Sequence, residues 1–214
     1  MDILIIAAHP DDEVLGMGAT IRKLVKKKKK IHLCVVTEGA TAQYKDDKMI
    51  KIRKESCIKA GKILGISTFN FLGFPDMKLD SIPQLEINIE LEKMIKKFNP
   101  EIVYTTPNND LNKDHQLVFE STIIATRPHS SKVKTVISYE IPGLVKEPFE
   151  PNLYEEITKE FSYKIKAFKK YTSEIQKYPS PRSLENLENW ANVRGMESNT
   201  KKAESFKIIK TIST

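Results

Sequence analysis

A histidine and two adjacent aspartates directly follow the first apolar segment of the chain, in the run Ala8-His9-Pro10-Asp11-Asp12-Glu13. Residues 3–8 are continuously apolar, as is typical of a strand buried on both faces, and residues 13–27 have the pattern of a helix. The acids therefore lie in the first strand-to-helix turn, at the edge where open α/β sheets bind ligands. Alternatively, Asp11 or Asp12 caps the helix, but a cap uses one acid and needs no preceding histidine.

A second polar run, Thr105 to His115, follows the fourth predicted strand and opens another helix. Because parallel strands end at the same sheet edge, the two runs can face each other across one crevice. We therefore interpret His115 as a partner of the first run. His32 lies inside the predicted core strand IHLCVV, and we interpret it as structural.

The two runs together supply the ligand types of a catalytic zinc site. Zinc favours histidine and carboxylate ligands, and catalytic sites use three of them plus a water; His9, Asp12 and His115 provide that set. A set of two imidazoles and one carboxylate also accepts ferrous iron. Zinc lowers the pKa of a bound water, and a carboxylate off the metal, Asp11, can take the proton.

One further carboxylate is expected to orient His115 by accepting its second ring proton, and either Asp110 or Asp114 can do so. The nucleophile would be water, since no GxSxG elbow occurs and neither cysteine is placed for covalent catalysis.

The first 140 residues alternate strand and helix patterns, which predicts an α/β fold with a mostly parallel sheet and helices on both faces. The predicted strands are 3–8, 31–37, 68–72, 102–106 and 135–140. The predicted helices between them are 13–27, 47–65, 83–98 and 114–126. No GxGxxG motif follows the first strand, which argues against dinucleotide binding.

The last third changes character after Glu140, where prolines and a glycine make a loop. Residues 157–177 read as one long helix and residues 184–193 as a shorter one. We expect a single domain over 1–214, with a core at 1–140 and a C-terminal helical layer at 141–214.

The formal net charge of +7 suggests an anionic partner, and five consecutive lysines, 26–30, are its most visible part. No aromatic residues are interleaved with them to stack bases, so we interpret the tract as a solvated helix end and expect no nucleic-acid partner. No apolar run is long enough for a membrane span. With no targeting signal and no disulfide framework, we expect a cytoplasmic protein.

The run AAHPDDEVLGMGATI closely resembles the opening motif of the PIG-L/LmbE-like de-N-acetylase family, and PNNDLNKDH resembles its second metal motif. Weaker matches follow the second strand at Thr37-Glu38-Gly39 and continue into the late segments 150–154, 171–173 and 203–206. The resemblance implies a Rossmann-like fold, one zinc ion and hydrolysis of an acetamide on a glucosamine-type sugar. Relatives often form trimers or larger rings, so a homo-oligomer is also implied.

Carried over residue by residue, the resemblance makes His9, Asp12 and His115 metal ligands and Asp11 the general base. Asp114 matches the carboxylate beside the last ligand, and Arg53 matches a position that contacts substrate. The chain departs from many relatives in one place. Asn112 stands where they have a histidine; its amide can stabilise an oxyanion but cannot supply a proton.

The resulting hypothesis is a zinc-dependent hydrolase that removes acetyl from an N-acetylated amino sugar. The positive charge, with Arg53 and Arg127, suits a conjugated substrate that is nucleotide-, lipid- or glycan-linked. Two alternatives are a non-catalytic protein that binds an anionic ligand or sugar phosphate in the same crevice, and a nucleic-acid binder that uses the lysine tract.

Overall fold

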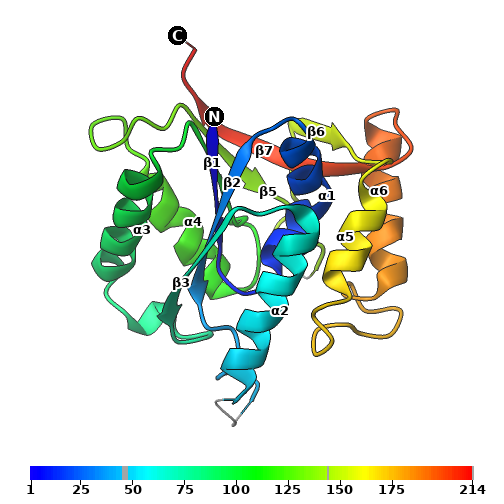
Figure 1. Ribbon diagram of the computed structural model, residues 1–214, viewed down its shortest axis with the longest axis horizontal. Helices are drawn as coiled ribbons and strands as arrows, with labels where there is room; N and C mark the ends of the chain where they lie inside the picture. Colours follow the sequence, from blue (N-terminus) through cyan, green and yellow to red (C-terminus); the bar gives the residue numbers. More distant parts are fainter. Residues whose placement is uncertain (45–47, 144, 214) are drawn as a thin grey trace.

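The computed structural model describes residues 1–44, 48–143 and 145–213. Within them, seven strands form one sheet in the order β3-β2-β1-β4-β5-β7-β6 (Figure 1). The first five strands are parallel, and β7 runs antiparallel to both of its neighbours. The strands are β1 (Asp2–Ala7), β2 (Lys30–Thr37), β3 (Thr68–Phe74), β4 (Ile102–Thr105), β5 (Thr135–Tyr139), β6 (Leu153–Glu156) and β7 (Ala203–Thr211).

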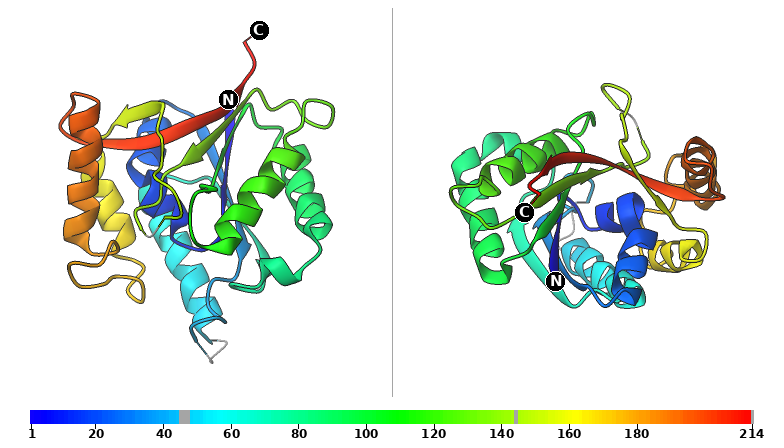
Figure 2. Two further views of the ribbon diagram at one scale, coloured as in Figure 1. Left: turned by 180° about the vertical axis from the view of Figure 1, so that it is seen from behind. Right: turned by 90° about the horizontal axis from the view of Figure 1, so that it is seen from above.

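Helices cover both faces of this sheet, which gives three layers (Figure 2). One face carries α1 (Asp12–Lys26), α2 (Lys48–Leu64), α5 (Phe161–Phe168) and α6 (Leu184–Glu197), and the other carries α3 (Gln84–Phe98) and α4 (Lys113–Ala125). The central strand β1 explains the two faces: Ile3 and Ile5 belong to the apolar core under α1 and α2, while Leu4 and Ile6 belong to the core under α3 and α4. Alternate residues of a strand point to opposite faces, so a strand buried on both sides must be continuously apolar.

The strand order places a topological switch point between β1 and β4. From β1 the chain crosses to β2 on one side, whereas β4 pairs with β1 on the other. Open α/β sheets bind ligands at such a point, outside the carboxyl ends of the strands. The loops that follow β1 and β4 carry the two polar runs.

Helix α1 is kinked at Met17, whose φ of −147° is not helical. A buried ion pair, Lys164 from α5 with Glu204 from β7, satisfies the backbone groups that the kink frees. Lys164 Nζ donates to the carbonyl of Leu15 at 2.7 Å and to Glu204 Oε1 at 2.7 Å. The Glu204 carboxylate also accepts the N–H groups of Ala19 and Thr20 at 3.1 and 2.7 Å. The last part of the chain thereby completes the first helix.

The α/β fold class and its mostly parallel sheet are confirmed, as are the five predicted strands and four helices of the first 140 residues, with ends that differ by at most two residues for the strands and one for the helices. The predicted start of the second helix, residue 47, lies outside the described residues. Lys26, Lys27 and Lys28 are exposed at the end of α1, as expected of a solvated helix end. None of the described helices is long and apolar enough to cross a membrane.

The prediction of one long helix over residues 157–177 is wrong, because α5 ends at Phe168 and turns follow. Beyond that point Tyr171 and Glu174 are buried through polar contacts with the site described below. Those contacts hold the chain in turns where helix propensity alone would continue the helix. The prediction of a helical layer over 141–214 is also wrong in part, because this region contains two strands, β6 and β7, in addition to α5 and α6.

Candidate metal centre and active site

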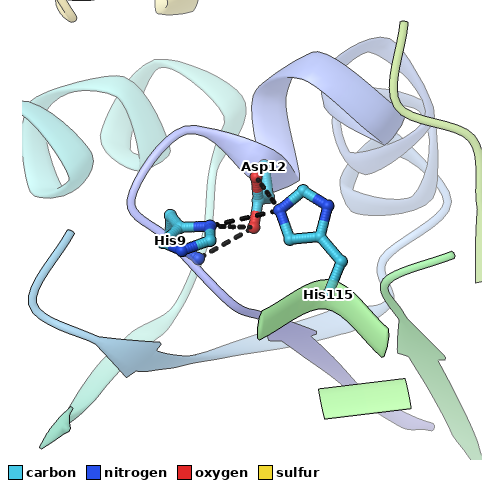
Figure 3. A group of neighbouring side chains, drawn as sticks. All are labelled: His9, Asp12 and His115. Atoms are coloured by element: carbon cyan, nitrogen blue, oxygen red, sulfur yellow. Dashed lines mark hydrogen bonds and ion pairs between the residues drawn. The ribbon is translucent and has the colours of Figure 1, made fainter. Parts of the chain in front are cut away.

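Three side chains converge where β1 and β4 end: His9 and Asp12 from the loop and helix start after β1, and His115 from the first turn of α4 (Figure 3). His9 Nδ1 lies 3.1 Å from His115 Nε2 and 3.6 Å from Asp12 Oδ2. His115 Nε2 lies 3.4 Å from Asp12 Oδ1. Nitrogens bound tetrahedrally to zinc at 2.0–2.1 Å are roughly 3.3 Å apart, so the spacing of these atoms fits one metal ion.

A second set, His9 with Asp76 and Asp114, has similar spacing and shares the His9 ring. One of its carboxylates is already committed, because Asp114 accepts the backbone N–H groups of Met77 and Leu79 at 2.8 and 3.2 Å. In contrast, Asp12 Oδ1 is buried and accepts no hydrogen bond from any described residue. A buried, unpartnered carboxylate oxygen is the atom a cation would satisfy, which favours the first set as the metal site.

Outer carboxylates orient both imidazoles from behind. His115 Nδ1 lies 2.7 Å from Asp110 Oδ2, and His9 Nε2 lies 3.2 Å from both Asp114 Oδ2 and Asp76 Oδ1. Carboxylates that accept the far ring proton hold metal-binding histidines in this way. Of the two alternatives left open by the sequence, Asp110 therefore contacts the ring of His115, whereas Asp114 contacts that of His9.

The electrostatics of the cluster favour a cation. Burial acts to lower the pKa of His115, but Asp12 and Asp110 outweigh it and raise that pKa to about 9. Burial likewise opposes the charged form of His9, yet Asp114 and Asp12 hold its pKa well above the usual value. The pKa of Asp12 is held well below its usual value despite burial, because His115 and His9 lie beside it. Carboxylates therefore dominate the field at the site.

Asp11 lies next to the candidate metal ligands in an unusual backbone conformation, with φ at 129°. Few residues other than glycine adopt this region. Its side chain is fully buried, and neither carboxylate oxygen accepts a hydrogen bond from the described residues. Burial raises the pKa of Asp11 to about 6, against the opposing influence of Arg182 and Arg53. A carboxyl with that pKa is suited to accept and return a proton near neutral pH.

The strained turn is fixed by Glu13, whose carboxyl Oε2 accepts the N–H of Asp11 at 3.1 Å. Tyr171 donates its hydroxyl to Glu13 Oε1 at 2.5 Å. Burial raises the pKa of Glu13 to about 8. The segment after α5 thus holds the loop that carries Asp11.

Two arginines flank the Asp11 carboxylate: Arg53 Nη2 lies 3.7 Å from Oδ1, and Arg182 Nη1 lies 3.5 Å from Oδ2. Glu174 joins them, since it is ion-paired with Arg53 and accepts from Arg182 Nη1 at 2.7 Å. Arg53 is only 3% exposed and also donates to the carbonyl of Pro10 at 2.8 Å.

Three residues of this site were not identified from the sequence: Asp76, Glu174 and Arg182. Tyr171 was identified only as part of the segment 171–173, not as a contact to the motif. The resemblance of segment 171–173 to the family was the one signal near them. Each lies in a loop or turn that reaches the site through tertiary contacts.

A cavity of about 360 Å³ opens beside the cluster, lined by His115, Asp110, Asn112, Gln176 and Arg182 among others. Asn112 is the N-cap of α4, and its side-chain oxygen accepts the N–H of Asp114 at 2.9 Å. That bond fixes the amide beside His115, with its NH₂ group as the remaining donor.

The structure does not bring Arg127 into the site. It follows α4 at the end opposite His115, where its exposed guanidinium lies 3.4 Å from Glu92. His115 is the third residue of α4 and Arg127 lies two residues beyond its end, which puts the two positions roughly 18 Å apart at 1.5 Å per residue. Arg127 is therefore not placed to contact a group held at His9, Asp12 and His115, and the prediction that it binds substrate gains no support from the site. His32 is buried, with Asp2 and Thr68 each 2.8 Å from a ring nitrogen, in keeping with a structural role.

The fold and the cluster define a Rossmann-like α/β protein with imidazole and carboxylate ligands at its switch point. Residues 4–126 match the family model PIG-L, described as GlcNAc-PI de-N-acetylase. The chain belongs to the PIG-L family. It is 34% identical over 180 residues to the uncharacterized deacetylase YaiS of Escherichia coli, covering 80% of this chain and 90% of that protein.

Solved structures share the fold at lower identity. The N,N'-diacetylchitobiose deacetylase of Pyrococcus horikoshii superposes with a TM-score of 0.83 at 21% identity, over 98% of this chain and 84% of that one. GalB of Pseudomonas putida, a 4-carboxy-2-hydroxymuconate hydratase, superposes with a TM-score of 0.80 at 19% identity, over 100% and 98%. Because the fold hosts more than one chemistry, function must be argued from the site.

Proposed function

We propose that the protein is a metal-dependent de-N-acetylase that removes the acetyl group from an N-acetylated amino sugar in a nucleotide-, lipid- or glycan-linked conjugate. The observation that carries this proposal is the buried carboxylate of Asp11, which accepts no hydrogen bond from the described residues, beside the candidate ligand set of His9, Asp12 and His115. The deacetylase names of relatives such as YaiS and the diacetylchitobiose deacetylase of Thermococcus kodakarensis support the reaction class.

His9, Asp12 and His115 hold one zinc ion in this proposal, and ferrous iron fits the same donors. When bound, the metal supplies Lewis acidity toward the amide carbonyl and lowers the pKa of water. Asp110 and Asp114 keep the two imidazoles in the required orientation.

Asp11 moves the proton. It takes one proton from the water that attacks the acetamide carbonyl carbon, and returns it to the sugar nitrogen as the C–N bond breaks. The products are acetate and a free amino sugar. Asn112 donates its amide N–H to the oxygen on which negative charge develops. With no histidine at position 112, Asp11 serves as both base and acid.

The two arginines have different roles in this proposal. Arg53 is too buried to reach far into the cavity, so it acts on the reaction by holding Asp11 and the Pro10 carbonyl. Arg182 lines the cavity with a side chain that is 33% exposed, and is the arginine that contacts substrate.

We further propose a single domain over residues 1–214 and a cytoplasmic location. Cys34 and Cys57 are free and buried, which is compatible with a reducing compartment.

The decisive experiment measures metal content and acetate release for the wild type and His115→Ala, purified without chelator and reconstituted with zinc. We expect about one zinc per chain and acetate from N-acetylglucosamine conjugates for the wild type, and the loss of both for the variant. Arg127→Ala is the matched control and should keep both. If the wild type bound no stoichiometric metal or released no acetate, the proposal would be refuted. A binding protein for anionic ligands would then be favoured.

A further inference from the structure

A second cavity, of about 230 Å³, lies next to the candidate active-site cavity and is bordered by α6. Both are bordered by Pro142, Gly143 and Pro181, so the two cavities lie side by side between His115 and Trp190, and together they are called the groove. The first cavity alone is at the low end of the roughly 300–1,000 Å³ typical of small-molecule sites. The groove therefore has room beyond the group that is placed at the metal ligands.

One face of α6 forms the wall of this second cavity. Asn186, Asn189, Trp190 and Val193 line it, and their spacing of three, one and three residues puts them on the same side of a helix. Trp190 and Val193 are 38% and 40% exposed, although they are large apolar residues. Asn189 is exposed beside them.

The indole of Trp190 is held in place. Its Nε1 donates to Glu140 Oε2 at 3.0 Å, and the guanidinium of Arg194 lies 5.2 Å from the ring centroid. Arg194 is itself bound to Glu140, with its Nε donating at 2.8 Å. A fixed aromatic ring that is still exposed in a groove offers a rigid stacking surface at little cost in side-chain entropy.

The loop opposite is also held from α6. Asn186 donates its amide to the carbonyls of Pro179 and Ser180 at 2.7 and 3.1 Å, and its Oδ1 accepts from Asn189 at 3.1 Å. The same loop carries Arg182 into the first cavity. The walls of both cavities are thus joined by hydrogen bonds.

From this arrangement we infer that the groove at Trp190 is a subsite for a second pyranose ring of a glycan substrate, whose acetamido sugar occupies the cavity beside His115. A pyranose has an apolar C–H face, which suits the indole, and hydroxyl groups at its edge, which suit the exposed amide of Asn189. This inference rests on the proposed function and narrows the conjugate to a glycan.

Trp190 is the one tryptophan in the chain, so its fluorescence reports on this subsite alone. The binding experiment titrates Asp11→Asn protein, loaded with zinc, with N-acetylglucosamine, N,N'-diacetylchitobiose and phenyl N-acetylglucosaminide. We expect a saturable change in emission with the disaccharide and none with the monosaccharide at equal concentration. An equal response to both sugars, no response at saturating disaccharide, or a response to the phenyl glycoside alone would overturn the inference.

The kinetic experiment compares kcat/KM on the disaccharide and the monosaccharide. Trp190→Ala should lower the value for the disaccharide about five- to tenfold through KM, the size expected for one aromatic contact, and leave the monosaccharide unchanged. Trp190→Phe should recover most of the loss. Met196→Ala, an exposed apolar residue of α6 outside the groove, is the matched control.

The two proposals fail in different ways. If the wild type releases acetate from both sugars but Trp190→Ala lowers neither value or lowers both equally, the subsite is refuted and the deacetylase stands. If the wild type releases no acetate from any sugar, the proposed function fails, while the fluorescence titration still decides the subsite. Asn189→Ala provides a second kinetic variant should Trp190→Ala fail to fold.

Discussion

Two buried clusters of charged residues contact helix α1, one at its first turn and one at its kink. They differ in how fully their carboxylate oxygens are hydrogen-bonded. At the kink, both oxygens of Glu204 accept hydrogen bonds, and Lys164 donates to Glu204 and to a backbone carbonyl. At the first turn, both oxygens of Asp11 and one of Asp12 accept none from the described residues. The cluster at the kink therefore completes the structure of α1, whereas the cluster at the first turn keeps carboxylate oxygens without hydrogen bonds.

The difference teaches how to separate structural charge from functional charge. Buried polar groups are normally hydrogen-bonded, and leaving one without a partner costs about 1–3 kcal/mol or more. The fold satisfies both oxygens of Glu204 but leaves those of Asp11 without a hydrogen bond, with two arginines nearby and the backbone strained, and this keeps Asp11 free for chemistry. Substitutions at the first turn should therefore mainly reduce activity, whereas substitutions at the kink should mainly reduce stability.

The largest effect is expected at Asp11. Asp11→Asn keeps the volume of the side chain but cannot accept a proton, so kcat for acetate release should fall by about 10²–10⁴. Zinc content should stay at the wild-type level, and any loss of stability should be smaller than for Glu204→Gln, because Glu174 still pairs with Arg53 and Arg182. Activity within a few fold of the wild type would show that Asp11 is not the base.

Glu204→Gln should show the reverse signature. It leaves the buried ammonium of Lys164 without its counter-ion, which should destabilise the fold by about 3–5 kcal/mol. Urea unfolding measures this, and zinc content of the folded fraction should be unchanged. The matched control is Glu188→Gln, an exposed pair with Lys202, for which we expect less than about 1 kcal/mol. Equal losses for the two variants would contradict the comparison.

A smaller effect is expected at Asp110, which combines features of both clusters. Asp110 accepts a hydrogen bond yet serves the site by orienting His115. Asp110→Asn should weaken zinc affinity by about 10–100-fold, as loss of an outer carboxylate does elsewhere, with little change in unfolding. A chelator competition assay measures it. Unchanged affinity would place Asp110 with the structural groups.

The smallest effect is expected at Asp2, which pairs with His32 at the amino end of β1, far from either cluster. The hydrogen bond from His32 lowers the pKa of Asp2 below 3.8. Because the folded pKa is depressed, the pair stabilises the protein above that value and loses its contribution as the pH falls through the folded pKa. Asp2→Asn should therefore be slightly less stable than the wild type at pH 6 and equally stable at acid pH. A stability difference that grows below pH 4 would have the wrong sign.

The sequence allowed the first two-thirds of the fold to be predicted because its signals are local. The apolar run before His9 reads as a buried strand without any knowledge of its neighbours, and parallel topology then brings His115 to the same edge. The positions of His9, Asp12 and His115 relative to one another follow from that rule.

The unpredicted parts depend on partners distant in sequence. Glu204 is a charged residue that is buried within strand β7. Strand β7 therefore lacks the alternation of apolar and polar residues by which a strand is recognised in a sequence. Arg182 lies between prolines and serines that read as a loop, and nothing near it indicates that its partner is Asp11. Turn-forming residues indicate where the chain changes direction, but not which distant residues it then contacts.

The hydrogen bonds between Glu204 and the kink of α1 also determine when, during folding, α1 can adopt its final shape. The carboxylate that completes the first helix lies 185 residues beyond the N–H of Ala19. Strand β7 must also be inserted between β5 and β6 before the sheet is whole. Such long-range contacts form late and slowly. During synthesis, the helix that carries Asp12 therefore emerges from the ribosome long before β7 but acquires its final shape only after β7 has been made, so a catalytically competent site should not form before then.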